Sequence, residues 1–192
     1  MRCKAVNNPL VNALIDLCAV NSLIRALLNL KCVVKRMDKW HNVNTDDDIS
    51  NLMESFAHFH DSCITEIRYT SGTGINADNA MIFAEPNDVQ ADFVFQSQWN
   101  PKTLVLRFAG IRKMHIVGWQ RYYSCEITGC YLKFHNDLIS NLDESLIVWA
   151  DDGGFYPMSF IEKRILSEPD TSFIIAENLA WREAEGYAEY AR

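Results

Sequence analysis

The sequence lacks the short motifs that mark several enzyme classes. No Gly-Lys-Ser/Thr follows the glycines of Ser71-Gly72-Thr73-Gly74, so a phosphate-binding loop is excluded, and there is no Gly-x-Ser-x-Gly nucleophile elbow. Asp151-Asp152-Gly153-Gly154 lacks the alternating oxygen ligands and the closing Glu of an EF-hand. We therefore expect no cofactor, and we interpret both glycine-containing segments as turns between strands.

The cysteines do not form a recognisable framework. There are six, none of them in a Cys-x-x-Cys pair: Cys3, Cys18, Cys32, Cys63, Cys125 and Cys130. Scattered cysteines in a chain of 192 residues are unlike the dense pattern of a small disulfide-stapled domain. Free thiols in a reducing compartment explain them most simply, and we expect a cytoplasmic protein.

The sequence has no long apolar run free of charge. The first 36 residues are rich in Leu, Ile and Val, but Asp16, Arg25 and several Asn residues interrupt them. A membrane-spanning helix needs about 20 mostly apolar residues, and a secretory signal needs a small-residue cleavage site. We predict neither, and we expect no association with a membrane.

The same segment predicts one helix or two short ones, broken near Asn21-Ser22. Such a helix is apolar on more than one face, so it must pack on the rest of the chain or on another copy. Residues 9–34 are therefore a candidate homo-oligomer interface. Met37-Asp38-Lys39-Trp40 resembles a natural protein start, so we treat 1–36 as a helical extension, accessory or without function, and 37–192 as one domain.

The chain carries a net negative charge. Its formal charge is −7, which makes nucleic acid an unfavourable partner because phosphate contacts need clustered Lys and Arg. Two basic segments, 1–40 and 101–135, either pair with acidic parts of the same chain or dock an acidic partner. The apolar fraction of 48% is that of an ordinary globular protein, so we expect a sizeable core.

Periodicity predicts an α+β fold. Thr45 and the three Asp residues after it are typical of a helix N-terminus, and the apolar spacing that follows predicts a helix over about 46–59. Apolar residues then recur with a period of two. Strands are predicted at 63–70, 80–84, 89–98, 104–108, 114–117, 125–134, 146–150, 156–166 and 172–181. We therefore expect N-terminal helices packed on a mainly antiparallel sheet or a two-layer β structure.

The segment from His58 to Cys63 holds most of the residues that could carry chemistry. Imidazole, carboxylate and thiolate are all zinc ligands, and His60 beside Asp61 could also serve as an acid or base. His115 and His135, in strand-like segments, could approach His60 and complete a three-His metal site. The alternative is that His60 and Asp61 end the helix and are hydrogen-bonded to the turn, which is the more common role for such residues.

A cysteine nucleophile is the other chemical hypothesis for this segment. Cys63 could act with His60, but catalysis needs a lowered thiol pKa and exposure. Because Cys63 opens an apolar strand, a buried and inert thiol is the favoured interpretation, and we expect the same of Cys125 and Cys130.

Tryptophans with polar neighbours indicate a binding surface. Trp is large and amphipathic, so it anchors interfaces as well as cores. Trp99 lies between Gln and Asn, and Trp119 is followed closely by Arg121 and Tyr122. These residues are candidates for contacts with a partner, or they belong to a sheet edge.

Four segments together resemble a known family. Phe59-His60-Asp61-Ser62-Cys63-Ile64, Gln98-Trp99-Asn100-Pro101, Gly118-Trp119-Gln120 and Ile147-Val148-Trp149-Ala150-Asp151 are similar to those of a family of small uncharacterised bacterial proteins. This resemblance spans about 37–182 and implies no activity. The Phe-His-Asp-Ser element also resembles one in immunity-type proteins of bacterial toxin systems, which implies a protein-binding role.

Two hypotheses for function follow. The first is a non-enzymatic, cytoplasmic protein-binding domain of the immunity type, whose acidic surface suits a basic partner. The second is a small metal-dependent or His/Asp/Cys-based hydrolase centred on His60 and Asp61.

Overall fold

The computed structural model describes residues 39–98, 103–118, 124–139, 144–157 and 171–184. Contacts divide the chain into two units, Met1–Lys39 and Trp40–Arg192, and all the described helices and strands belong to the second. The predicted helical extension and its oligomer interface at 9–34 lie outside the described residues. Within the part that is described, no helix is long and apolar enough to cross a membrane.

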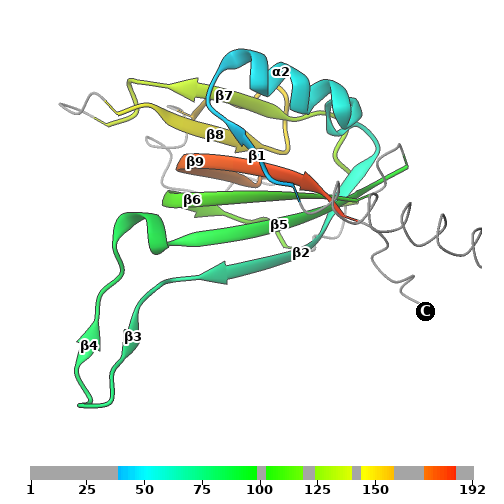
Figure 1. Cartoon of the computed structure of the whole chain (residues 1–192). Coiled ribbons are helices and arrows are strands. Elements are labelled where there is room, and N and C mark those ends of the chain that lie inside the picture. Colours follow the sequence, from blue (N-terminus) through cyan, green and yellow to red (C-terminus); the bar gives the residue numbers. More distant parts are fainter. Residues whose placement is uncertain (1–38, 99–102, 119–123, 140–143, 158–170, 185–192) are drawn as a thin grey trace, which may run out of the picture. The chain divides into compact units, whose positions relative to one another are not determined.

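A seven-stranded antiparallel sheet forms most of the described structure (Figure 1). Across the sheet the strands follow the order β2 (Ser62–Thr70), β5 (Gln90–Ser97), β6 (Thr103–His115), β9 (Phe173–Glu183), β8 (Leu146–Ala150) and β7 (Tyr131–His135), with β1 (His41–Val43) paired to β9. All the pairings are antiparallel, which confirms the predicted sheet.

The helix α2 (Asp46–Ser55) begins where the sequence predicts, because Thr45 and Asp48 form a capping box. The Thr45 hydroxyl oxygen accepts from the Asp48 N–H at 3.2 Å, and the Asp48 carboxylate accepts from the Thr45 N–H at 3.0 Å. The backbone N–H of Asn44 and the Thr45 hydroxyl hold the pKa of Asp48 below its ordinary value. A charged Asp48 therefore fixes the first turn.

The predicted end of this helix, at Phe59, is wrong. The helix stops at Ser55, and Ala57, His58 and Phe59 form a 3₁₀ turn, η1 (Ala57–Phe59), with φ values of +48°, +54° and +62°. This left-handed region costs L-residues about 1–2 kcal/mol each. The complete burial of Phe59 offsets that cost and fixes the turn against the core.

The core lies between α2 and one face of the sheet. Ile49 and Leu52 of α2 join a cluster built largely from aromatic side chains of the central strands. The opposite face of β8 and β9 buries a second cluster, formed by Leu146, Val148, Ala150, Phe155, Phe173 and Ile175. Because β8 is buried on both faces, all of its residues are apolar.

Strand boundaries agree with the sequence in part. The strand predicted at 146–150 is confirmed with the same bounds. The two strands predicted at 104–108 and 114–117 form the single strand β6. The strand predicted at 125–134 is shorter, since only an isolated bridge at Ile127 precedes β7, and the one predicted at 156–166 lies outside the described residues from 158 onward.

A hairpin, residues 71–85, leaves the sheet at the end of β2 and is called the arm below (Figure 1). It contains β3 (Gly74–Ile75) and β4 (Met81–Ile82), which pair only with each other, and η2 (Pro86–Asp88) follows it. The turn predicted at 71–74 is therefore wrong. The chain reverses at Asn76, whose side-chain oxygen accepts from the N–H groups of Asp78 at 3.0 Å and Ala80 at 2.9 Å.

Candidate functional site

His60 and Asp61 lie between η1 and β2, on the surface. The His60 Nδ1 and Asp61 Oδ1 atoms are 3.0 Å apart, and the two side chains are 57% and 27% exposed. Asp61 has a φ of +55°, and the Ser62 hydroxyl donates to the carbonyl of Phe59 at 2.5 Å. The left-handed turn thus holds a His–Asp pair at the start of β2.

A polar pocket of about 380 Å³ lies next to this pair. Asp61 and Cys63 both line it, so the structure brings together two of the three predicted residues, while His60 is not part of its wall. The remaining lining residues are Ser62, Gln96, Ser97, Gln98, Ser124 and Glu126. Among the described residues, the wall carries two carboxylates and no basic group, which favours polar or cationic groups over anions.

The cysteines of this region differ in exposure. Burial raises the pKa of the Cys63 thiol above its ordinary value, and the nearby Cys125 thiolate would raise it further. Burial raises the pKa of Cys130 to about 12. Cys125 is exposed, so the expectation of a buried thiol there is wrong.

We expect Cys63 to react slowly with iodoacetamide at neutral pH. Only the thiolate reacts, and the raised pKa keeps that form scarce below pH 9.0, the ordinary value for this thiol. Peptide mapping by mass spectrometry at several pH values would follow the reaction, with the exposed Cys125 as the internal control. Cys63 should fall behind Cys125 at neutral pH and accelerate in alkaline buffer. Equal labelling at neutral pH would contradict the raised pKa and would favour a nucleophilic Cys63.

The three candidate metal ligands belong to separate elements: His60 lies between η1 and β2, and His115 and His135 end different strands. His115 ends β6 and packs on Phe173, with ring centroids 5.7 Å apart. His135 ends β7, and its Nε2 lies 2.7 Å from the hydroxyl oxygen of Tyr131. Among the described residues, no group of three or more His, Cys, Asp or Glu side chains could hold a metal ion. His60, His115 and His135 therefore do not form the three-His site that the sequence left open as a possibility.

The predicted aromatic binding residues cannot be placed in the fold. Trp99, Trp119, Arg121 and Tyr122 all lie outside the described residues.

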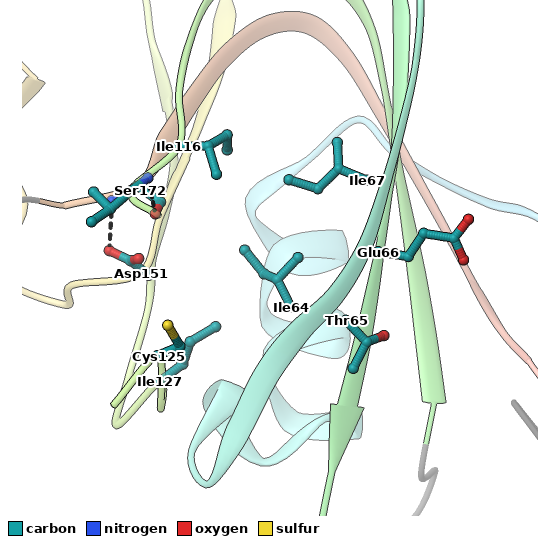
Figure 2. A pocket seen from close by; sticks show the side chains of 10 residues that line it. Ile64, Thr65, Glu66, Ile67, Ile116, Cys125, Ile127, Asp151 and Ser172 are labelled. Carbon is teal, nitrogen blue, oxygen red and sulfur yellow. Dashed lines mark hydrogen bonds between the residues drawn. The ribbon is translucent and has the colours of Figure 1, made fainter. Parts of the chain in front are cut away.

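A second cavity, called the cleft below, has a volume of about 310 Å³ and lies along β2. Figure 2 shows Ile64 and Ile67 of β2 pointing across it toward Ile116. Ile127 lines the cleft as well, so one part of its wall is aliphatic. The remaining lining residues are Thr65, Glu66, Val117, Cys125, Asp151 and Ser172.

Three hydrogen bonds between described residues hold the polar end of the cleft. The Asp151 carboxylate accepts from the Ser172 N–H at 2.9 Å, and the Asp151 N–H donates to the Ser172 carbonyl at 3.0 Å. The Ser172 hydroxyl oxygen accepts from the Val117 N–H at 3.1 Å. These bonds fix the residue after β8, the residue before β9 and the end of β6 around one carboxylate.

The arm exposes large apolar side chains on a thin two-stranded ribbon. Ile75 pairs with Met81, so both point to one face. Phe83 directly follows β4, and the alternation of an extended chain assigns it to the same face. These three side chains, called the apolar arm face below, are 71%, 62% and 75% exposed. Ile82, on the opposite face, is 50% exposed.

The sequence hypotheses did not identify the arm or the cleft as sites. The available signal for the arm is a stretch without bases: residues 69–98 include Asp78, Glu85, Asp88 and Asp92 but no Lys, Arg or His. The cleft has no local signal, because its residues come from five separate segments. Neither a family model nor a curated protein nor a solved structure matches this chain.

Proposed function

We propose that this chain is a non-enzymatic, cytoplasmic protein-binding domain of the immunity type, which captures a basic partner through the apolar arm face. The observation that carries the proposal is the exposure of Ile75, Met81 and Phe83 together on one side of the arm. Contiguous exposed apolar side chains on a folded protein indicate an interaction site.

The geometry of the arm supports this role. Two strands of two residues each cannot bury their own side chains, since a hairpin needs a third strand or a helix to form a core. The root of the arm is nevertheless fixed: a Cβ built on Gly72 would lie 2.6 Å from the Asp88 Cβ, and Asn178 of β9 donates to Asn87 at 3.2 Å. A fixed root and an uncovered ribbon are suited to presentation of a contact surface.

Charge indicates the kind of partner. The arm and its root carry Asp78, Glu85 and Asp88 without a compensating base, so a second copy of the arm would meet like charge. A partner with Lys or Arg around an apolar patch would gain both burial and attraction. A toxin-neutralising role is one function in which an acidic protein holds a basic one.

Photo-crosslinking tests the proposal directly. We expect a benzophenone amino acid at position 83, in cells that make the full chain, to crosslink one basic protein that mass spectrometry can identify. The benzophenone amino acid at position 156 is the control, because Tyr156 is 63% exposed but lies far from the arm in sequence. It should not crosslink the basic protein.

The identified protein is then purified and titrated against arm variants. Phe83→Asp should weaken binding at least tenfold, because a buried contact is replaced by an unpaired charge. Ile82→Asp introduces the same charge on the opposite face and should have a much smaller effect. Equal affinities for the wild type and Phe83→Asp, or an adduct consisting of two copies of this chain, would contradict the proposal.

The alternative function is a hydrolase, and the observation that favours it is the contact between His60 and Asp61 beside the polar pocket. The raised pKa of Cys63 weighs against a cysteine nucleophile. A native mass spectrum of untagged protein, purified without chelator, tests the metal-dependent form. An excess mass of one zinc ion that disappears in His60→Ala would favour the hydrolase.

A further inference from the structure

We propose that the outer edge of β4 accepts a strand of the captured partner, and that this strand has apolar residues at alternate positions and a Lys or Arg at each end. The proposal deepens the protein-binding function and rests on it, because the strand belongs to the partner that the apolar arm face would bind. It adds a mode of recognition, in which backbone hydrogen bonds supply affinity and alternate side chains supply specificity.

The backbone of the arm supplies the first argument. β3 and β4 pair only with each other, so each has one edge without a neighbour among the described strands (Figure 1). The Asn76 N–H donates to the Ala80 carbonyl at 2.9 Å, and the Ala80 N–H donates to the Asn76 side-chain oxygen at 2.9 Å. Ala80 therefore directs both backbone groups toward β3. Because this direction alternates along an antiparallel strand, Met81 and Phe83 direct theirs to the outer edge.

The outer edge of β4 lacks the features by which proteins protect an exposed strand. Charged side chains, proline and bulges are the common protections. Residues 80–84 are Ala-Met-Ile-Phe-Ala, without charge or proline, and the register between the described residues of β3 and β4 does not shift. Gly74 weakens the corresponding edge of β3, because glycine is disfavoured in strands and has no side chain to pack. The edge of β4 is therefore the one suited to pairing.

The side chains indicate the pattern of the added strand. The apolar arm face consists of Ile75, Met81 and Phe83, which are 71%, 62% and 75% exposed. A strand paired along β4 directs alternate side chains to that face, next to Met81 and Phe83. Apolar residues at those alternate positions would bury both side chains. A third strand also supplies the minimum that a hairpin needs to form a stable sheet.

Charge indicates what lies at the ends of the added strand. Asp78 precedes the run 80–84, and Glu85 follows it. Neither carboxylate forms an ion pair with a described Lys, Arg or His. Glu85 is the first residue of the capping box at η2, which uses backbone N–H donors and no cation. A Lys or Arg at each end of the added strand would therefore meet a carboxylate that has no cationic partner among the described residues.

The same two acids disfavour a second copy of this chain as the occupant. If two copies paired antiparallel along β4, with Met81 of one opposite Phe83 of the other, Asp78 of each copy would lie near Glu85 of the other. Like charges across a strand pair are destabilising, and here they would meet at both ends. The occupant that fits this edge is a strand of a different, basic protein.

The first test is amide hydrogen exchange, followed by NMR, of the full chain with the probe peptide Lys-Val-Thr-Val-Thr-Val-Lys at low ionic strength. We expect saturable binding that slows exchange of the Met81 and Phe83 amides at least tenfold. The same peptide, N-methylated at its central Thr-Val-Thr, keeps every side chain and charge but loses its central donors on both edges. It should bind at least tenfold more weakly. A Glu-Val-Thr-Val-Thr-Val-Glu peptide should also bind at least tenfold more weakly, because its ends meet Asp78 and Glu85.

A proline variant tests the edge from the side of the protein. Because the Met81 N–H points outward, Met81→Pro removes a donor to the added strand without removing a hydrogen bond between β3 and β4. Met81→Ala is the matched control, since it loses the same side chain and keeps the N–H. Met81→Pro should bind the Lys-ended peptide at least tenfold more weakly than Met81→Ala. Equal affinities of the two variants would overturn strand addition, and the N-methylated peptide tests the same point on the unaltered chain.

The outcomes separate this proposal from the protein-binding function. Absent binding of the Lys-ended peptide, or equal binding of its N-methylated form, would overturn strand addition. A basic protein crosslinked at position 83, with an affinity that Phe83→Asp lowers, would in that case still support the protein-binding function. Peptide-induced protection of Met81 and Phe83, together with no basic protein crosslinked at position 83, would support the strand-accepting edge and contradict capture of a basic partner in the cell.

Discussion

Replacing Trp149 by Ala is expected to lower the free energy of unfolding by about 3–5 kcal/mol. Trp149 is fully buried in β8, with its ring centroid 6.2 Å from Phe59, 6.2 Å from Phe93 and 5.3 Å from Phe95. Removing the indole leaves a cavity beside η1 and β5 that the surrounding core would have to collapse to fill. Since single domains are stable by about 5–15 kcal/mol, this one change would remove a large share of the total.

Urea unfolding followed by far-UV circular dichroism measures the effect without relying on tryptophan fluorescence. Trp40→Ala is the matched control: Trp40 is only partly buried, and the guanidinium groups of Arg107 and Arg182 lie 4.2 Å and 5.2 Å from its ring centroid. Cation–π contacts at such sites contribute about 0.5–1 kcal/mol each, so the control should lose about 1–2 kcal/mol. A loss for Trp149→Ala no larger than that of the control would contradict the packing described for β8.

The indole N–H of Trp149 is also the least satisfied polar group of the core. It lies beside the Cys130 thiol, a weak acceptor, and has no other hydrogen-bond partner among the described residues. The wide aromatic surface of Trp149, rather than its polar atom, therefore accounts for its place in the core.

Local sequence signals are sufficient to predict an element where one apolar period or one helix cap determines its bounds. Thr45 and Asp48 set the start of α2, because the cap is made within four residues. The run 146–150 was identified with its bounds, because a strand buried on both faces is apolar throughout. In both places the residues that decide the structure are neighbours in sequence.

The end of α2 depends on contacts that are distant in sequence. Periodicity extends the helix to Phe59, and the apolar spacing there is real, since Phe56 and Phe59 are both buried. The left-handed turn buries Phe59 against Phe95 and Trp149 instead of continuing the helix. Three non-glycine residues with positive φ carry no local signature, so no sequence pattern could indicate them.

The sequence does not indicate either the apolar arm face or the cleft, for a different reason in each case. The apolar arm face was predicted in part as a strand at 80–84, but an apolar strand is normally buried, and only the structure shows that nothing in the described chain covers it. The cleft requires β2 to lie near the ends of β6 and β8, which follows from strand order rather than from any motif.

Gly110 is the other position where one substitution should have a large effect. It lies in the central strand β6 with a φ of +68°, immediately before the register shift between Ile111 and Lys113. A Cβ built there would be 2.8 Å from the Cβ of Glu177 on the neighbouring strand. The predicted strands 104–108 and 114–117 leave a gap at this glycine, although the left-handed residue lets β6 continue past the bulge.

We expect Gly110→Ala to lower the free energy of unfolding by about 2–4 kcal/mol. Left-handed strain in a residue with a Cβ costs about 1–2 kcal/mol, and the displacement of a packed neighbour adds about as much again. Glu177 also forms an ion pair with Arg112, with 2.7 Å between the two atoms, so its displacement would disturb that contact. Gly110→Ala should therefore lower the free energy of unfolding by less in a Glu177→Ala background. Alanine at 177 lacks the Cγ and Cδ atoms that the new Cβ would meet.

Urea unfolding again provides the measurement, with Gly129→Ala as the matched control. No described atom lies within 4 Å of a Cβ built at Gly129, so that variant should change stability by less than about 0.5 kcal/mol. If the two alanine variants were equally stable, the left-handed conformation at Gly110 would not be a requirement of the fold. If Gly110→Ala alone were destabilised, the glycine would be the residue that allows β6 to pair with β9 on both sides of the register shift.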